Sequence, residues 1–203
     1  MPIGAKPTGE GDRWRQRIAV SLDHHASARA LRHAALDADL ATWTRELTSV
    51  VVDACEAHGW RAAAKGHPLD LLPKDGQEYL SLDVMAFDPG ASPWPFPVAV
   101  MELENSKDPA RIAYSLWKVL CVRCPLRVVY CYRPTAEEAR ELVETLRQEV
   151  IAPLAPNERL ALGGETMVTV GLQGQAAVFP HGFFRSWLLD LGTGQFRPWA
   201  GGG

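Results

Sequence analysis

Two carboxylates that lie close together in the sequence are the residues best suited to chemistry. Glu102 and Glu104 stand at the end of an apolar run that begins at Pro97. Because alternate side chains of a β-strand share one face, both carboxylates would point the same way, about 7 Å apart. Unpaired buried carboxylates are costly, and a divalent cation is one of the few partners that makes such a cluster favourable. The pattern therefore predicts a metal site.

A third acid and a group of cations extend this candidate site. Asp83 lies in an earlier run with the alternation of a strand, residues 78–87. After Glu104, the segment from Lys107 to Arg133 holds six basic residues and one acid, which gives it a charge of +5 in a chain of net charge −3. A basic stripe beside an acidic cluster suits a phosphate substrate and a metal ion. On charge alone, a solvated helix face explains the stripe equally well.

The elements that must position these residues can be read from hydrophobic periodicity. A helical period runs over residues 36–58, and further helices are expected from Asp108 to about Val122 and from Thr135 to about Val150. Strands are expected at 60–65, 79–87, 97–104, 126–132, 167–172 and 187–191, the last with a hairpin back through Phe196. This order predicts an α/β fold, a mixed central sheet flanked by helices. We expect a disordered leader over residues 1–20 and one domain over residues 21–203.

The helix that follows the two glutamates carries a polar stripe separate from its apolar face. Arg111, Ser115 and Lys118 recur at i, i+4 and i+7, which places them on one side of the helix. If this side faces the carboxylates, Lys118 is the better candidate for a cation in the site. If it faces solvent, Lys118 is a surface charge, and Lys107, just beyond the strand, is the remaining lysine.

Composition excludes several classes of protein. A net charge of −3 and a pI near 6.1 argue against a protein that coats nucleic acid non-specifically. No apolar run approaches the roughly 18 residues of a membrane span, and the first residues lack the apolar core of a signal peptide, so we expect a cytoplasmic protein with no membrane partner. The CxxC at Cys121 and Cys124 has no second pair, so buried free thiols are favoured over zinc.

Over roughly residues 36–133, the order helix, strands, helix, strand resembles the core of the PD-(D/E)XK nuclease superfamily, the restriction endonuclease-like fold (αβββαβ). Asp83 matches the acid of the second core strand, and Glu102, 19 residues later, matches the acid at the end of the third. Glu104 stands where the family usually has its lysine, which is a departure from the motif.

The resemblance implies a site for Mg²⁺, with Mn²⁺ as a substitute, and hydrolysis of phosphodiester bonds in DNA. Asp83 and Glu102 would bind the metal, together with the backbone carbonyl of Leu103. Glu104 would be a further ligand or a general base.

The same resemblance assigns roles to side chains around the carboxylates. Lys118 or Lys107 would replace the missing lysine, and Arg111 and Ser115 would contact the phosphate. Glu46, on the first long helix, would be an outer-shell acid. Cleavage of both strands of a duplex would be served by a homodimer.

Two other functions remain open at this point. One is a catalytically inactive module on the same fold that binds protein or nucleic acid, which the replacement of lysine by Glu104 and the acidic pI favour. The other is a glycoside hydrolase that uses Glu102 and Glu104, whose expected spacing of about 7 Å falls within the range for paired catalytic carboxylates.

Overall fold

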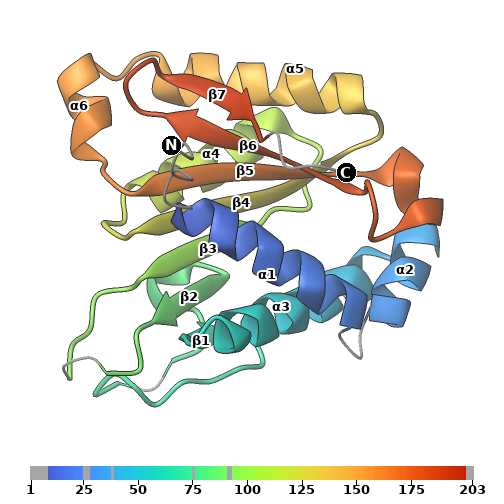
Figure 1. The fold of residues 1–203 in the computed structure, drawn as a ribbon, viewed down its shortest axis with the longest axis horizontal. Helices are drawn as coiled ribbons and strands as arrows, with labels where there is room; N and C mark the ends of the chain where they lie inside the picture. The colour runs from blue at the N-terminus through green and yellow to red at the C-terminus, as the bar shows by residue number, and fades with distance from the viewer. Residues whose placement is uncertain (1–8, 25–27, 38, 75, 91–92, 200–203) are drawn as a thin grey trace, which may run out of the picture.

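The computed structural model describes residues 9–24, 28–37, 39–74, 76–90 and 93–199. Seven strands form one mixed sheet in sequence order, with helices on both faces (Figure 1). The helices are α1 (Glu10–His24), α2 (Ala28–Asp37), α3 (Leu40–Ala57), α4 (Pro109–Leu120), α5 (Ala136–Leu146) and α6 (Pro156–Ala161). The strands are β1 (Arg61–Ala64), β2 (Val84–Phe87), β3 (Ala99–Leu103), β4 (Leu126–Arg133), β5 (Glu165–Leu172), β6 (Phe184–Asp190) and β7 (Gln195–Pro198).

The centre of the sheet is parallel and its edges are antiparallel. Strands β3, β4 and β5 run parallel, whereas β1–β2–β3 and β5–β6–β7 are antiparallel. All eight residues of β4 are buried, as expected for a central strand covered on both faces. The predicted α/β class, with a mixed sheet flanked by helices, is therefore confirmed.

Two hydrophobic cores lie on opposite faces of the sheet. On one face, α1, α2 and α3 pack against side chains such as Met101 and Val128. On the other face, α4 and α5 pack against the alternate side chains, such as Val100 and Val129. Glu102 lies on the α4 side of β3, because it alternates with Met101. The candidate site is therefore built between β3 and α4.

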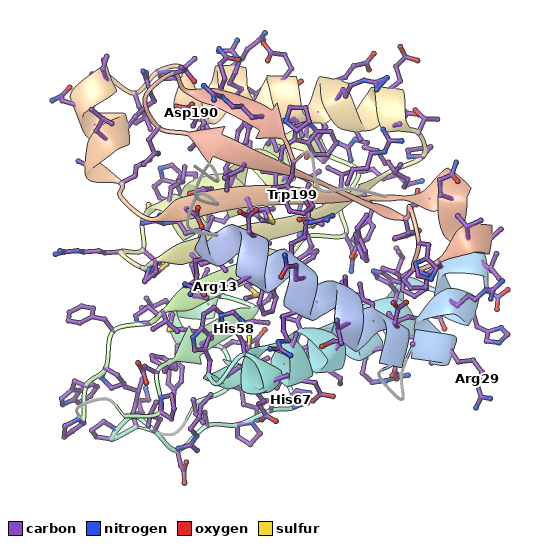
Figure 2. The ribbon with its side chains drawn as sticks, in the orientation of Figure 1. Arg13, Arg29, His58, His67, Asp190 and Trp199 are labelled. Atoms are coloured by element: carbon purple, nitrogen blue, oxygen red, sulfur yellow. The ribbon has the colours of Figure 1, made fainter. Side chains whose placement is uncertain are left out.

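The predicted leader is wrong over residues 10–20, which belong to α1. Trp14 and Ile18 are spaced by four residues and are buried against the sheet, and the indole N–H of Trp14 donates a hydrogen bond to the Tyr130 hydroxyl at 3.1 Å. A further contact holds α1 in place, because His58 Nε2 lies 2.7 Å from Glu10 Oε1. Figure 2 shows where His58 lies, next to the end of α3. Residues 1–8 of the predicted leader lie outside the described residues.

Three predicted boundaries also move. The helix expected over 36–58 begins at Leu40, because the Asp39 side chain accepts a hydrogen bond from the backbone N–H of Thr42 and caps α3. The strand expected over 79–87 is confined to β2, preceded by a 3₁₀ turn, η1 (Tyr79–Ser81). The helix expected to reach Val150 changes to a π-helical turn, η2 (Arg147–Ile151). A second 3₁₀ turn, η3 (Gln173–Val178), follows β5, and neither η3 nor α6 was predicted.

No helix within the described ranges is both long and apolar enough to cross a membrane.

Candidate active site between β3 and α4

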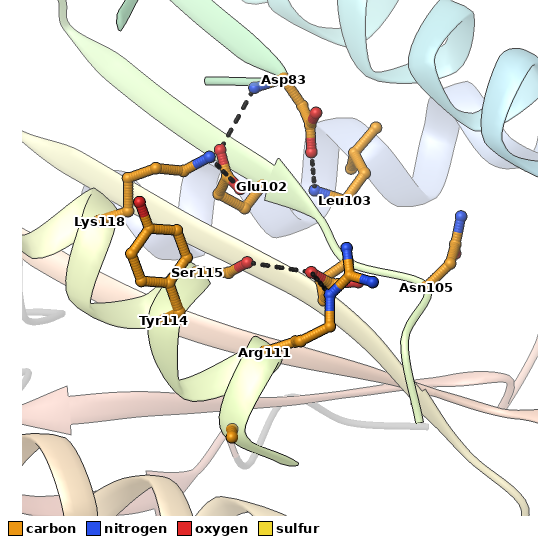
Figure 3. Close-up of a pocket in the computed structure, with 10 residues that line it drawn as sticks. Asp83, Glu102, Leu103, Asn105, Arg111, Tyr114, Ser115 and Lys118 are labelled. Carbon is orange, nitrogen blue, oxygen red and sulfur yellow. Dashed lines mark hydrogen bonds and ion pairs between the residues drawn. The ribbon is translucent and has the colours of Figure 1, made fainter. Parts of the chain in front are cut away.

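A cavity of about 540 Å³ lies where β2 begins, β3 ends and α4 passes over them (Figure 3). Most of the side chains that line it are polar or charged. They are Asp83, Glu102, Leu103, Glu104, Asn105, Ala110, Arg111, Tyr114, Ser115 and Lys118. The cavity therefore brings together Asp83, the β3 carboxylates and the complete polar stripe of α4.

Asp83 and Glu102 link the start of β2 to the end of β3. The Asp83 carboxylate accepts a hydrogen bond from the backbone N–H of Leu103 at 2.7 Å. In return, Glu102 Oε1 accepts from the backbone N–H of Asp83 at 3.3 Å. The antiparallel register of β2 and β3 pairs Val84 with Met101, and this pairing brings the residues just outside it into contact. The two acids are thus neighbours in space although 19 residues separate them.

Lys118 reaches the same carboxylate from α4. Its Nζ lies 2.8 Å from Glu102 Oε2 and donates a second hydrogen bond to the Ser81 carbonyl at 2.7 Å. Leu80 and Ser81 both have φ near +55°, a conformation that costs energy in a residue other than glycine. This strained turn aims the Ser81 carbonyl at the ammonium group. Lys118 is therefore held at a defined position in the cavity.

Glu104 is held by its own loop and by α4. Its Oε1 accepts from the backbone N–H of Ser106 at 2.7 Å, and its Oε2 accepts from the Ser115 hydroxyl at 3.4 Å. Arg111 Nε lies 3.9 Å from the same Oε2, and 70% of the Arg111 side chain is exposed. Glu104 therefore faces α4, on the same side of β3 as Glu102.

The local sequence explains why the stripe of α4 meets these acids. Asp108 caps the helix by accepting a hydrogen bond from the backbone N–H of Ala110 at 3.0 Å, and Pro109 occupies the first turn. The apolar side of α4, which includes Ile112 and Leu116, packs on the sheet. Residues three and four apart then share the side that overlooks the end of β3.

Burial dominates the electrostatics of Glu102. Only 4% of this residue is exposed, and loss of hydration raises the pKa of the carboxyl group to about 7. The charge of Asp83 raises the pKa further, whereas the hydrogen bond from Lys118 and its positive charge lower it. Even with a lysine at 2.8 Å, the pKa of Glu102 therefore stays well above that of an exposed glutamate. A further cation beside Asp83 and Glu102 would stabilise the ionised form.

Two residues predicted for the site lie elsewhere. Lys107 is exposed in the loop before α4 and does not line the cavity, since the chain turns away from β3 at that point. Glu46 lies on α3, where its carboxylate contacts the adjacent Arg45 at 3.2 Å, and it does not line the cavity either. Of the two lysines left open by the sequence, only Lys118 reaches the carboxylates.

Three contributions to the site were not predicted. Asn105 lines the cavity, and its side-chain amide donates a hydrogen bond to the Thr44 hydroxyl on α3. Tyr114 also lines it, and the spacing that identified the stripe would have found this residue, because it stands four residues before Lys118. The Ser81 carbonyl had no signal in the sequence, because its role depends on the conformation of η1.

Comparisons with protein-family models, with curated proteins and with solved structures find no match for this chain.

The side chains at the cavity decide which metal ion it could hold. Within the described residues, no group of three or more His, Cys, Asp or Glu side chains is arranged to hold a metal ion. This argues against a site of the zinc type, which takes at least three protein ligands. Mg²⁺ requires less of the protein, because one or two carboxylates bind it together with water and substrate phosphate oxygens. Asp83 and Glu102 supply two carboxylates at one cavity, so the residues present fit Mg²⁺.

Proposed function

We propose that this protein is a Mg²⁺-dependent hydrolase of phosphodiester bonds in DNA. The observation that carries the proposal is the convergence at one cavity of Asp83, just before β2, Glu102 on β3 and Lys118 on α4. Two carboxylates next to a fixed lysine combine the groups that phosphodiester hydrolysis needs, namely metal ligands and a positive charge for the phosphate.

The arrangement of the elements supports the same proposal. The order α3, β1, β2, β3, α4, β4 and the parallel pairing of β3 with β4 agree with a restriction endonuclease-like core. In that core, the acids of the second and third strands would be Asp83 and Glu102. We therefore assign the core to residues 40–133, with β5, β6 and β7 extending the sheet beyond it.

Each residue then has a defined task. Asp83 and Glu102, with the Leu103 carbonyl, would hold Mg²⁺, which when bound lowers the pKa of a water molecule and neutralises charge on the phosphate. Lys118 stabilises the negative charge that develops on the phosphate oxygens, the task of the motif lysine that Glu104 replaces. Arg111 and Ser115, about two turns and one turn before Lys118 on α4, would orient the phosphate. Glu104 accepts the hydrogen bond of Ser115 and would take a proton from the water that attacks the phosphorus, while the P–O bond to the leaving oxygen breaks and that oxygen takes a proton from solvent.

The proposal is tested by incubating the purified chain with plasmid, linear duplex and single-stranded DNA, with Mg²⁺ or with EDTA. We expect cleavage that needs Mg²⁺ or Mn²⁺. The variants Asp83→Asn and Glu102→Gln preserve side-chain size, and each should reduce the rate by at least a hundredfold, as expected when a metal ligand is lost. Activity that survives both substitutions would refute the carboxylate assignment.

Matched controls separate the site from the rest of the surface. Asp88→Asn changes an exposed acid just beyond the far end of β2 and should leave the rate unchanged. Lys118→Met should abolish cleavage, whereas Lys107→Met should retain it, because Lys107 does not line the cavity. Equal losses in the two lysine variants would contradict the role of Lys118.

The second candidate is a non-catalytic module on the same fold, and the presence of Glu104 at the lysine position favours it. The test is calorimetry with Mg²⁺ or Mn²⁺. Absence of heat at millimolar metal, together with absence of cleavage, would support this candidate. Binding that disappears in Asp83→Asn would support the hydrolase.

A further inference from the structure

Two large aromatic side chains stand in solvent on α4, next to the candidate active site. Tyr114 is 60% exposed and Trp117 is 54% exposed. Their rings are stacked on each other, with centroids 5.7 Å apart and an angle of 29° between the planes. Two stacked rings that are exposed to this degree leave outer faces on which a planar ligand can stack. We call Tyr114 and Trp117 the aromatic pair.

The aromatic pair is continuous with the cavity. Tyr114 lines the cavity itself, and Trp117 directly precedes Lys118, whose ammonium group contacts Glu102. A third exposed apolar side chain, Leu80 at 73%, belongs to the strained turn whose Ser81 carbonyl holds Lys118. Exposed apolar surface therefore borders the cavity at α4 and at η1.

Positive charge alternates with these rings along the helix. The largely exposed Arg111 precedes Tyr114 by three residues, and Lys118 follows Trp117 directly. Of the six basic residues from Lys107 to Arg133, Arg127 and Arg133 are buried, so the exposed positive charge of this segment lies at Lys107, Arg111 and Arg123. Rings interleaved with cations are the combination that single-stranded nucleic acid requires, because its bases stack on aromatic faces while its phosphates pair with basic side chains.

We propose that the aromatic pair binds unpaired bases of single-stranded DNA beside the scissile phosphate. This inference rests on the proposed function for the position of that phosphate at Glu102 and Lys118. Bases within a duplex are stacked on one another and cannot lie flat on a side chain, whereas bases of a single strand can. The preferred substrate would therefore be a single strand, a frayed end or a flap, rather than continuous duplex.

Binding is measured without catalysis, by fluorescence anisotropy of a labelled 15-nucleotide single strand and of the matching duplex in EDTA. The double variant Tyr114→Ala/Trp117→Ala should raise Kd for the single strand by about tenfold or more, because each ring that is lost removes a stacking contact with a base. Its effect on duplex Kd should be less than about twofold. The variant Tyr114→Phe/Trp117→Phe has an aromatic ring at both positions and should therefore retain single-strand binding.

The matched control is Trp94→Ala, because Trp94 is 66% exposed but lies in the loop that precedes β3, at the opposite end of this strand from Glu102. Trp94→Ala should bind both probes as the wild type does. Equal Kd values for wild type and the Ala/Ala variant, absence of single-strand binding in the wild type, or equal weakening by Trp94→Ala would each overturn the proposal.

The outcome is separable from the proposed hydrolysis. Mg²⁺-dependent cleavage with no effect of the Ala/Ala variant on single-strand Kd would overturn the aromatic pair and leave the hydrolase intact. Single-strand binding that needs the pair, without cleavage, would support the pair and refute the hydrolase. A second copy of the chain could also cover the aromatic pair, and sedimentation tests for it. A wild-type dimer that becomes a monomer in the Ala/Ala variant would show such an interface and would overturn the proposal.

Discussion

Replacement of Glu102 by glutamine should make the metal-free protein more stable at neutral and alkaline pH. Burial raises the pKa of this carboxyl group from 4.5 to about 7. Between these two values the folded protein binds more protons than the unfolded chain, so the free energy of unfolding falls as pH rises. This rise of about 2.5 in the pKa corresponds to a decrease of roughly 3 kcal/mol in the free energy of unfolding. The figure is an upper limit, because Lys118 lies beside the carboxylate. Glutamine has the shape of the neutral acid and avoids this loss.

The assay is urea unfolding followed by tryptophan fluorescence, which the seven tryptophans of the chain make practical, from pH 4 to pH 8.5 in EDTA. The other titratable groups contribute the same pH dependence in both proteins, so their contribution cancels when the two free energies of unfolding are subtracted. We expect equal stability below about pH 4.5 and an advantage for Glu102→Gln that grows to roughly 3 kcal/mol by pH 8.

The control for this measurement is Glu141→Gln, on an exposed position of α5, which should change the free energy of unfolding by less than about 0.5 kcal/mol throughout. If Glu102→Gln is instead less stable than the wild type at pH 8, the ion pair with Lys118 outweighs the burial of the carboxylate. In that case our account of the electrostatics of the cavity is refuted.

Three further predictions concern the stability of the fold, and each can be checked by the same urea titration. Arg127→Met should cost about 3 kcal/mol or more, because this buried guanidinium donates hydrogen bonds of 2.8–2.9 Å to three backbone carbonyls that would lose their partners; an effect below about 1 kcal/mol would contradict this role. Asp108→Ala should cost about 1 kcal/mol through loss of the α4 cap, whereas Asp108→Asn should retain most of the stability. Gly171→Ala should cost about 1–3 kcal/mol, because the new methyl group would lie 2.6 Å from a ring carbon of Tyr132; a neutral result would mean that the ring can move aside.

Much of the fold was predictable because periodicity is a local property. The continuous apolar run at 126–132 predicts a buried central strand, and β4 confirms it. The helix starts expected at Asp108 and Thr135 are also confirmed: Asp108 caps α4, and the Thr135 hydroxyl caps α5 by accepting from the backbone N–H of Glu138 at 3.2 Å. Periodicity did not reveal α1, whose short amphipathic pattern follows a polar stretch rich in glycine. It also predicted a strand at η1, where tertiary contacts favour a 3₁₀ turn instead.

Which face of each element carries the polar groups follows from the sequence alone. The alternation of β3 places Glu102 and Glu104 on one side, and the helical period places Arg111, Ser115 and Lys118 on another, because both repeats are fixed by backbone geometry.

That these faces meet depends on how the strands and helices pack against one another. The register of β2 on β3 brings Asp83 to the Leu103 amide, and the packing of α4 brings Lys118, rather than Lys107, to Glu102. The resulting burial raises the pKa of Glu102, and it depends on all of these elements at once. Local periodicity carries no information about such contacts, since they join residues that are far apart in the chain.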